Sequence, residues 1–128
     1  MKHTIISALQ AGWPNCQWAL LDCNDFSTLA WHSMHVPKPS LEDVQAKIEE
    51  LDRAEAMRLL RQRRDDLLAQ TDVKALPDFP HASDAVRAAW LAYRRALRDM
   101  TIDASPSLDP ATYELAEGSV AWPEPPTI

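Results

Sequence analysis

The sequence is poor in glycine, and this scarcity removes two common kinds of binding site. Gly12 and Gly118 are the only glycines among the 128 residues. A phosphate-binding loop and a dinucleotide-binding fingerprint each need several closely spaced glycines. Neither motif can be written with these two residues.

The sequence also lacks an excess of basic residues and any long apolar run. Its formal net charge is -6, which disfavours a nucleic-acid partner because a phosphate-binding surface needs a basic excess. Even the longest apolar runs are short, such as residues 19–21, so no segment is predicted to span a membrane. The first ten residues are too weakly apolar for a secretory signal. We therefore expect a cytoplasmic protein.

The chain has two cysteines, Cys16 and Cys23. In an extended segment they would lie about 23 Å apart, at roughly 3.3 Å per residue, which is far beyond disulfide reach. We expect two free thiols that behave as small apolar side chains.

Residue patterns typical of metal binding or catalysis are missing. His32 and His35 could ligate a metal together with Cys16, Cys23, His3 or Asp22, but no paired Cys-x-x-Cys or His-Glu-x-x-His spacing is present. No nucleophile elbow or Ser/His/Asp order appears either. We expect no metal, no cofactor and no enzymatic activity.

Residues 1–36 have the pattern of a small antiparallel β unit. Three strands are predicted, at residues 4–9, 16–21 and 29–32, and turn residues separate them. Trp18 and Trp31 are expected to pack this sheet. Such a sheet needs helices on one face to be stable.

Residues 37–100 have the pattern of a helical hairpin. Pro37 and Pro39 end the β unit, and Ser40 with Asp43 resembles a capping box before a helix at residues 41–70. Ser83 is a second candidate cap, before a helix at residues 84–100. In this second helix an apolar stripe repeats at intervals of four and three residues, namely Val86, Trp90, Tyr93, Leu97 and Met100. This stripe is too short for a free coiled coil, but it permits a homodimer.

Residues 101–128 form an acidic tail with five Asp or Glu and no Lys or Arg. Asp109 and Pro110 could begin a short helix. Trp122 and Pro123 lie in a polyproline-like end, where Trp122 either folds back onto the hairpin or stays exposed as an anchor for a partner. The predicted fold class is α+β: a small N-terminal antiparallel β-sheet, a helical hairpin and a Pro-rich C-terminal tail.

From about residue 57 to 126, the sequence resembles the phage tail assembly chaperone family, also called tail fibre assembly proteins. The matching pieces are residues 61–68, the Thr-Asp of residues 71–72, the Leu-Pro-Asp of residues 76–78, Trp90, residues 93–100 and the Val-Ala-Trp-Pro of residues 120–123. Val73 replaces the Trp of the family's Thr-Asp-Trp, and Met100-Thr101 replaces Ile-Pro.

The resemblance implies a protein that binds a tail-fibre or other tail protein in the host cytoplasm and assists its folding or assembly. The alternative is a structural virion component, such as a baseplate or fibre-attachment adaptor, retained in the tail. The hypothesis for the binding surface names Arg94, Arg95 and Arg98, which lie off the apolar stripe, together with Trp122 and Pro123. The arginines would set the orientation of the bound partner.

Overall fold

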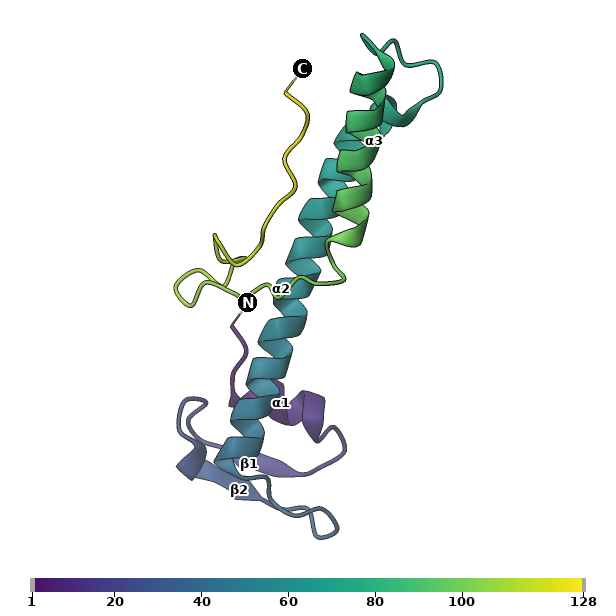
Figure 1. Cartoon of the computed structure of the whole chain (residues 1–128). Coiled ribbons are helices and arrows are strands. Elements are labelled where there is room, and N and C mark those ends of the chain that lie inside the picture. Colours follow the sequence, from purple (N-terminus) through teal and green to yellow (C-terminus); the bar gives the residue numbers. More distant parts are fainter. Residues whose placement is uncertain (1, 128) are drawn as a thin grey trace. The chain divides into compact units, whose positions relative to one another are not determined.

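In the computed structural model, which describes residues 2–127, the first element is a helix and not the strand predicted at residues 4–9 (Figure 1). This helix, α1 (Ile5–Gly12), begins with a capping box between Thr4 and Ser7. Its buried residues Ile5, Ala8 and Leu9 follow helical spacing. The strand prediction was wrong because a six-residue segment with four apolar residues fits either structure, and the Thr4–Ser7 capping box decides for the helix.

Two short strands follow α1. β1 (Trp18–Leu20) pairs antiparallel with β2 (Leu29–Trp31), so that Trp18 lies opposite Trp31 and Leu20 opposite Leu29. The second and third predicted strands are therefore confirmed in shortened form, and the sheet has two strands instead of three. The turn between them contains a 3₁₀ helix, η1 (Phe26–Thr28), capped by Asp25.

The described residues form two compact units that divide between residues 55 and 56. The core of the first unit contains Ile5, Ala8 and Leu9 from α1, Leu29 from β2 and Val44 from the start of α2. Trp18 and Trp31 pack against this core, as predicted. Each element buries one apolar face against the others, which stabilises a sheet too small to stand alone.

The long helix α2 (Leu41–Thr71) begins at the predicted capping box. The Ser40 backbone N–H donates to Asp43 Oδ2 at 3.1 Å, and the Asp43 N–H donates to Ser40 Oγ at 3.0 Å. These bonds satisfy two backbone donors that the first turn of a helix leaves unpaired. The predicted range of 41–70 is confirmed to within one residue.

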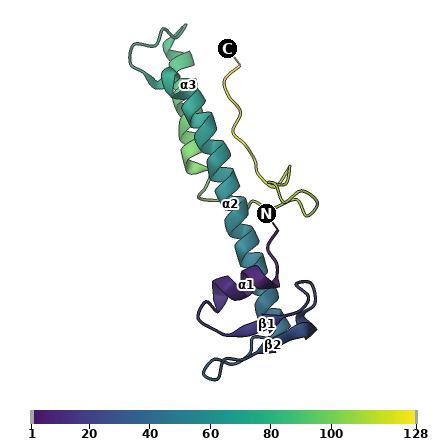
Figure 2. The ribbon, with the colours of Figure 1, turned by 180° about the vertical axis from the view of Figure 1, so that it is seen from behind.

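The second unit pairs the later part of α2 with α3 (Asp84–Asp99), which runs in the opposite direction (Figures 1 and 2). A 3₁₀ helix, η2 (Asp72–Ala75), begins the connector between them. Ser83 caps α3 by accepting the Val86 N–H at 3.2 Å, as predicted. The buried apolar residues of this pair are Ala56, Leu60, Tyr93 and Leu97.

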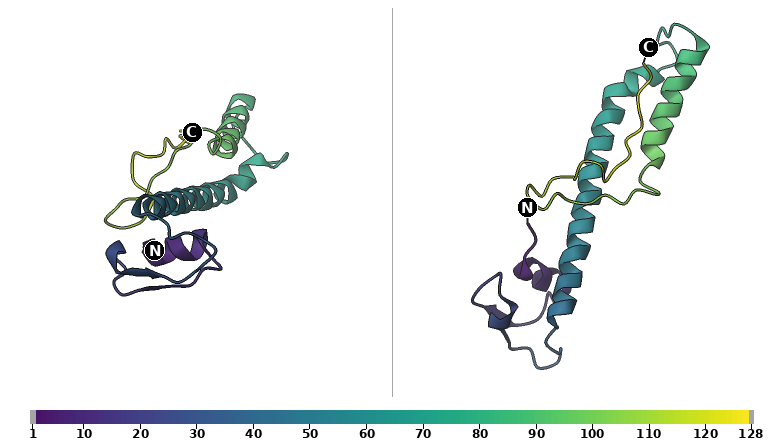
Figure 3. Two further views of the ribbon diagram at one scale, coloured as in Figure 1. Left: turned by 90° about the horizontal axis from the view of Figure 1, so that it is seen from below. Right: turned by 60° about the vertical axis from the view of Figure 1, so that its left-hand side comes forward.

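After α3, residues 101–127 form an irregular segment in which the predicted helix at Asp109 does not occur. Asp109 Oδ1 instead accepts the Ala111 N–H at 2.8 Å, and Leu108 forms a β-bridge with Leu115. Tyr113 has a φ of 56°, in the left-handed region, which reverses the chain there. Residues beyond Ser119 run back beside the helical pair (Figure 3). The α+β fold class is confirmed.

Candidate protein-binding surface

Arg94 holds the end of α2 to α3 and does not face outward. Its Nη1 donates to the Leu68 carbonyl oxygen at 2.7 Å and to Thr71 Oγ1 at 2.8 Å, and its Nη2 donates to Asp72 Oδ1 at 2.7 Å. Only 9% of the residue is exposed. Carbonyls at a helix C-terminus have no partner within the helix, and a guanidinium satisfies them well. Arg94 is therefore removed from the predicted protein-binding surface.

The connector between α2 and α3 is also fixed by side chains. Arg87 donates to the carbonyl oxygens of Leu76 at 3.3 Å and Phe79 at 3.0 Å. Lys74 Nζ lies 4.5 Å from the ring centroid of Phe79 and 5.1 Å from that of Trp90. These contacts leave the connector ordered although it contains little regular structure.

The same connector exposes apolar side chains. Val73 is 47% exposed and Leu76 is 48% exposed. The Leu76 carbonyl oxygen accepts from Arg87, and the Leu76 N–H donates to the Val73 carbonyl oxygen at 3.3 Å. The two side chains are therefore presented from a loop whose backbone is hydrogen-bonded. An ordered loop that exposes apolar side chains is a candidate contact for another protein.

Arg95 and Arg98 lie on the exposed face of α3, where the prediction placed them. Among residues 2–127, neither forms a hydrogen bond or an ion pair. Leu91 precedes Arg95 by four residues and Arg98 by seven, so all three share one helix face. Leu91 is 42% exposed. This face, defined by Leu91, Arg95 and Arg98, is called the α3 face below.

Trp122 folds back onto α2, which was one of the two predicted alternatives. The guanidinium carbon of Arg63 lies 4.9 Å from the centroid of the Trp122 ring. Trp122 and Pro123 are both half-buried. The two residues are thus engaged within the chain and are not freely exposed.

A family model described as "Phage tail assembly chaperone protein" matches residues 57–127. This is more than half of the chain. The chain belongs to the phage tail assembly chaperone family. No curated protein and no solved structure matched it.

The match to the phage tail assembly chaperone family covers the helical hairpin and the tail. The α3 face, the exposed connector and Trp122 all lie inside it. Two motif pieces that are distant in the sequence also meet in space, because Thr71 and Asp72 bind Arg94. Part of the family pattern is therefore explained by the contact that joins the two helices.

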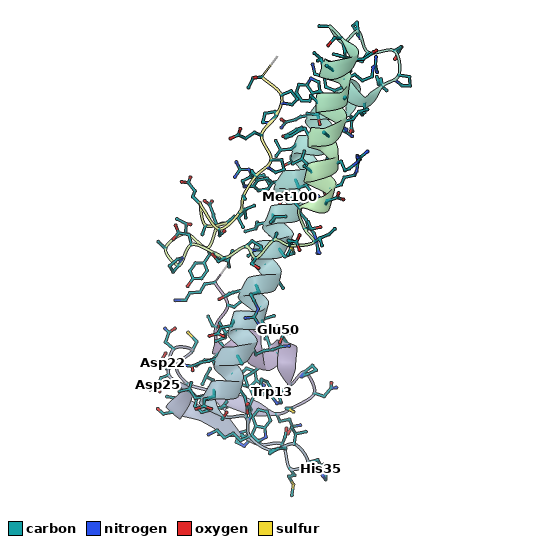
Figure 4. All side chains as sticks on the ribbon, in the orientation of Figure 1. Trp13, Asp22, Asp25, His35, Glu50 and Met100 are labelled. Atoms are coloured by element: carbon teal, nitrogen blue, oxygen red, sulfur yellow. The ribbon has the colours of Figure 1, made fainter. Side chains whose placement is uncertain are left out.

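The candidate metal ligands of this chaperone-family protein lie in its first unit. Among the described residues, no three His, Cys, Asp or Glu side chains gather closely enough to hold a metal. Figure 4 shows His35 and Asp22 at opposite ends of the strand pair. Cys16 and Cys23 are free, as predicted. Within residues 2–127, no helix is both long and apolar enough to cross a membrane.

Sequence reasoning missed four residues of this surface. Leu91 was not singled out, Val73 and Leu76 were named only as parts of the family pattern, and Arg63 was not paired with Trp122. A signal for Leu91 was present, because an apolar residue off the main stripe with arginines four and seven positions later marks a mixed face. Nothing in the sequence separates the exposed connector side chains from buried ones.

Proposed function

We propose that this family member binds a phage tail protein, with a tail-fibre protein as the first candidate, and assists its folding or assembly in the host cytoplasm. The proposal includes no enzymatic step and no cofactor. It is carried by the α3 face, where Leu91 is solvent-exposed beside the unpaired Arg95 and Arg98. An apolar contact flanked by arginines is a common arrangement at protein interfaces.

The α3 face would act by covering an apolar surface of the client that aggregates when left open. Leu91 supplies apolar contact, and Arg95 and Arg98 attract acidic groups around that contact. Tyr93 is excluded from this role because it is 7% exposed and belongs to the core of the helical pair. Val73 and Leu76 on the connector offer a second apolar contact.

The test of chaperone activity is co-expression with the candidate fibre protein. We expect the soluble yield and trimer content of the fibre to fall when the chain is absent. A fibre that folds and trimerises equally well alone would contradict the proposal. Mass spectrometry of purified particles decides the alternative, because a stoichiometric copy number would identify a structural virion component.

The test of the α3 face is charge reversal. Arg95→Glu with Arg98→Glu is expected to weaken client binding about tenfold, since each interfacial charge contributes about 1 kcal/mol or less and the two are reversed. Isothermal titration calorimetry would measure the affinity, and circular dichroism would confirm folding.

The matched control for this reversal is Arg53→Glu with Arg61→Glu. Both residues are exposed on α2, and the double variant changes the net charge by the same amount. Its client affinity is expected to stay near wild type. Equal losses in the two double variants would show that only net charge matters and would refute the α3 face.

A further inference from the structure

The last described residues lie beside α2 with few specific contacts. None of residues 120–127 forms a hydrogen bond to another described residue. Ser119, just before them, is held by its hydroxyl, which donates to the Ala116 carbonyl oxygen at 2.7 Å. The hydrogen-bonded segment therefore ends at Ser119. Residues 120–127, called the strap below, form no hydrogen bond within the described part of the chain.

The strap is held by the contact between Trp122 and Arg63. The guanidinium carbon of Arg63 lies 4.9 Å from the centroid of the Trp122 ring, and Arg63 itself remains exposed to solvent. Trp122, Pro123 and Pro126 are half-buried. A single cation–π contact at an exposed site changes an equilibrium by about two- to fivefold. Opening the strap breaks no hydrogen bond, so it belongs to the low-stability end of the molecule.

The acidic residues 101–128, which include the strap, have a charge opposite to the basic excess of residues 56–100. Residues 56–100 contain nine Lys or Arg and six Asp or Glu, whereas residues 101–128 contain five acids and no base. The strap beside Arg63 is thus extended and rich in proline, and it carries one acid, Glu124, and one aromatic residue, Trp122. This chemistry defines what the Arg63 surface accepts.

We propose that the Arg63 surface of α2 binds an extended acidic segment of the client that carries an aromatic residue, and that the strap occupies this surface until the client displaces it. The inference rests on the proposed function for the identity of the partner. The geometry itself supplies the template, because the chain's own Trp122 segment is seated there.

The surface is tested first without any client. The probe is a synthetic peptide of residues 119–127, titrated into ¹⁵N-labelled full-length chain. Trp122→Ala opens the site, so the peptide should bind this variant and shift amide signals of α2 around Arg63. In the wild type the tethered strap competes for the site. Because its single cation–π contact shifts the equilibrium only about two- to fivefold, the peptide should bind about two- to fivefold more weakly.

Two further full-length variants make this result specific. Adding Arg63→Ala to Trp122→Ala should weaken peptide binding by about two- to fivefold. Adding Arg61→Ala should leave it unchanged, because Arg61 is exposed two residues away on another side of the helix. A peptide that does not bind, or that binds equally without Arg63, overturns the proposed surface.

The second arm measures client affinity. Trp122→Ala should bind the client about two- to fivefold more tightly than wild type, Trp122→Phe should resemble wild type, and the peptide should compete with the client. If Trp122→Ala binds the client no more tightly than wild type, or if the peptide does not compete with the client, the proposal that the client displaces the strap is overturned. If no variant binds any tail protein, the proposed function fails, and the peptide titration still decides the surface.

Discussion

The four arginines of α3 have the same chemistry but different surroundings. Arg87 is bonded to the connector, Arg94 is buried against the end of α2, and Arg95 and Arg98 are free on the α3 face. Arg94 follows Tyr93 and precedes Leu97 by three residues, so it lies at the edge of the buried stripe. An arginine side chain is long enough to reach a partner from an exposed position. From the edge of the stripe, the Arg94 side chain reaches the Leu68 carbonyl oxygen instead.

Arg94→Ala is therefore expected to lower the free energy of unfolding by about 2 kcal/mol. Most of this loss comes from the Leu68 carbonyl, which keeps only the longer 3.2 Å bond from the Thr71 hydroxyl, and from that hydroxyl, which no longer accepts from Arg94. Asp72 contributes less because its carboxylate is largely exposed and stays hydrated. Urea denaturation monitored by circular dichroism would measure the change.

Arg95→Ala is the matched control for Arg94→Ala, since Arg95 is the next residue and is exposed. It should change the free energy of unfolding by less than about 0.5 kcal/mol. Equal effects of the two substitutions would show that the bonds of Arg94 do not stabilise the hairpin. Arg94→Lys should fall between them because an ammonium cannot reproduce the two-pronged contact.

At the scale of elements, the helix caps at Ser40 and Ser83 were reliable sequence signals, whereas the candidate cap at Asp109 begins no helix. Ser40 with Asp43 and Ser83 predicted the starts of α2 and α3 because a cap is a local interaction that needs no tertiary contact. The strand predicted at residues 4–9 is a helix because the capping box at Thr4 outweighs an apolar pattern that fits either structure. Turn geometry around Tyr113 could not be predicted, since it depends on the pairing of residues 108 and 115.

The two caps give a prediction for the helices they begin. Ser40→Ala and Ser83→Ala are each expected to lower the free energy of unfolding by about 1 kcal/mol, because each leaves a backbone N–H of the first turn without its side-chain acceptor. Ser105→Ala, at an exposed position in the tail, serves as the control and should have little effect. Thermal denaturation of the three variants would measure this, and three equal melting temperatures would contradict it.

At the scale of the whole molecule, charge is distributed unevenly along the chain. Residues 1–55 contain eight acids and four bases, and residues 101–128 contain only acids, so the basic excess is confined to residues 56–100. Net charge alone suggested an acidic protein and could not reveal a basic surface within it. The α3 face and Arg63 both belong to this basic region, and both lie within the family-matched part of the chain.

This distribution predicts how salt affects client binding. Raising the ionic strength from about 0.1 M to about 1 M shortens the Debye length from about 10 Å to about 3 Å. We expect the affinity for the client to fall, mainly through a slower association rate, because exposed arginines attract acidic groups over distances that salt screens. Surface plasmon resonance at several salt concentrations would separate the two rate constants.

The salt dependence also identifies which arginines take part. The variant with Arg95→Glu and Arg98→Glu should show a flatter dependence than wild type, because the screened attraction has been removed, whereas Arg53→Glu with Arg61→Glu should keep the wild-type slope. An affinity that rises with salt would mean that apolar contact through Leu91 dominates. In that case the arginines would exclude wrong partners and would not attract the correct one, since burying apolar area supplies affinity while charge supplies selectivity.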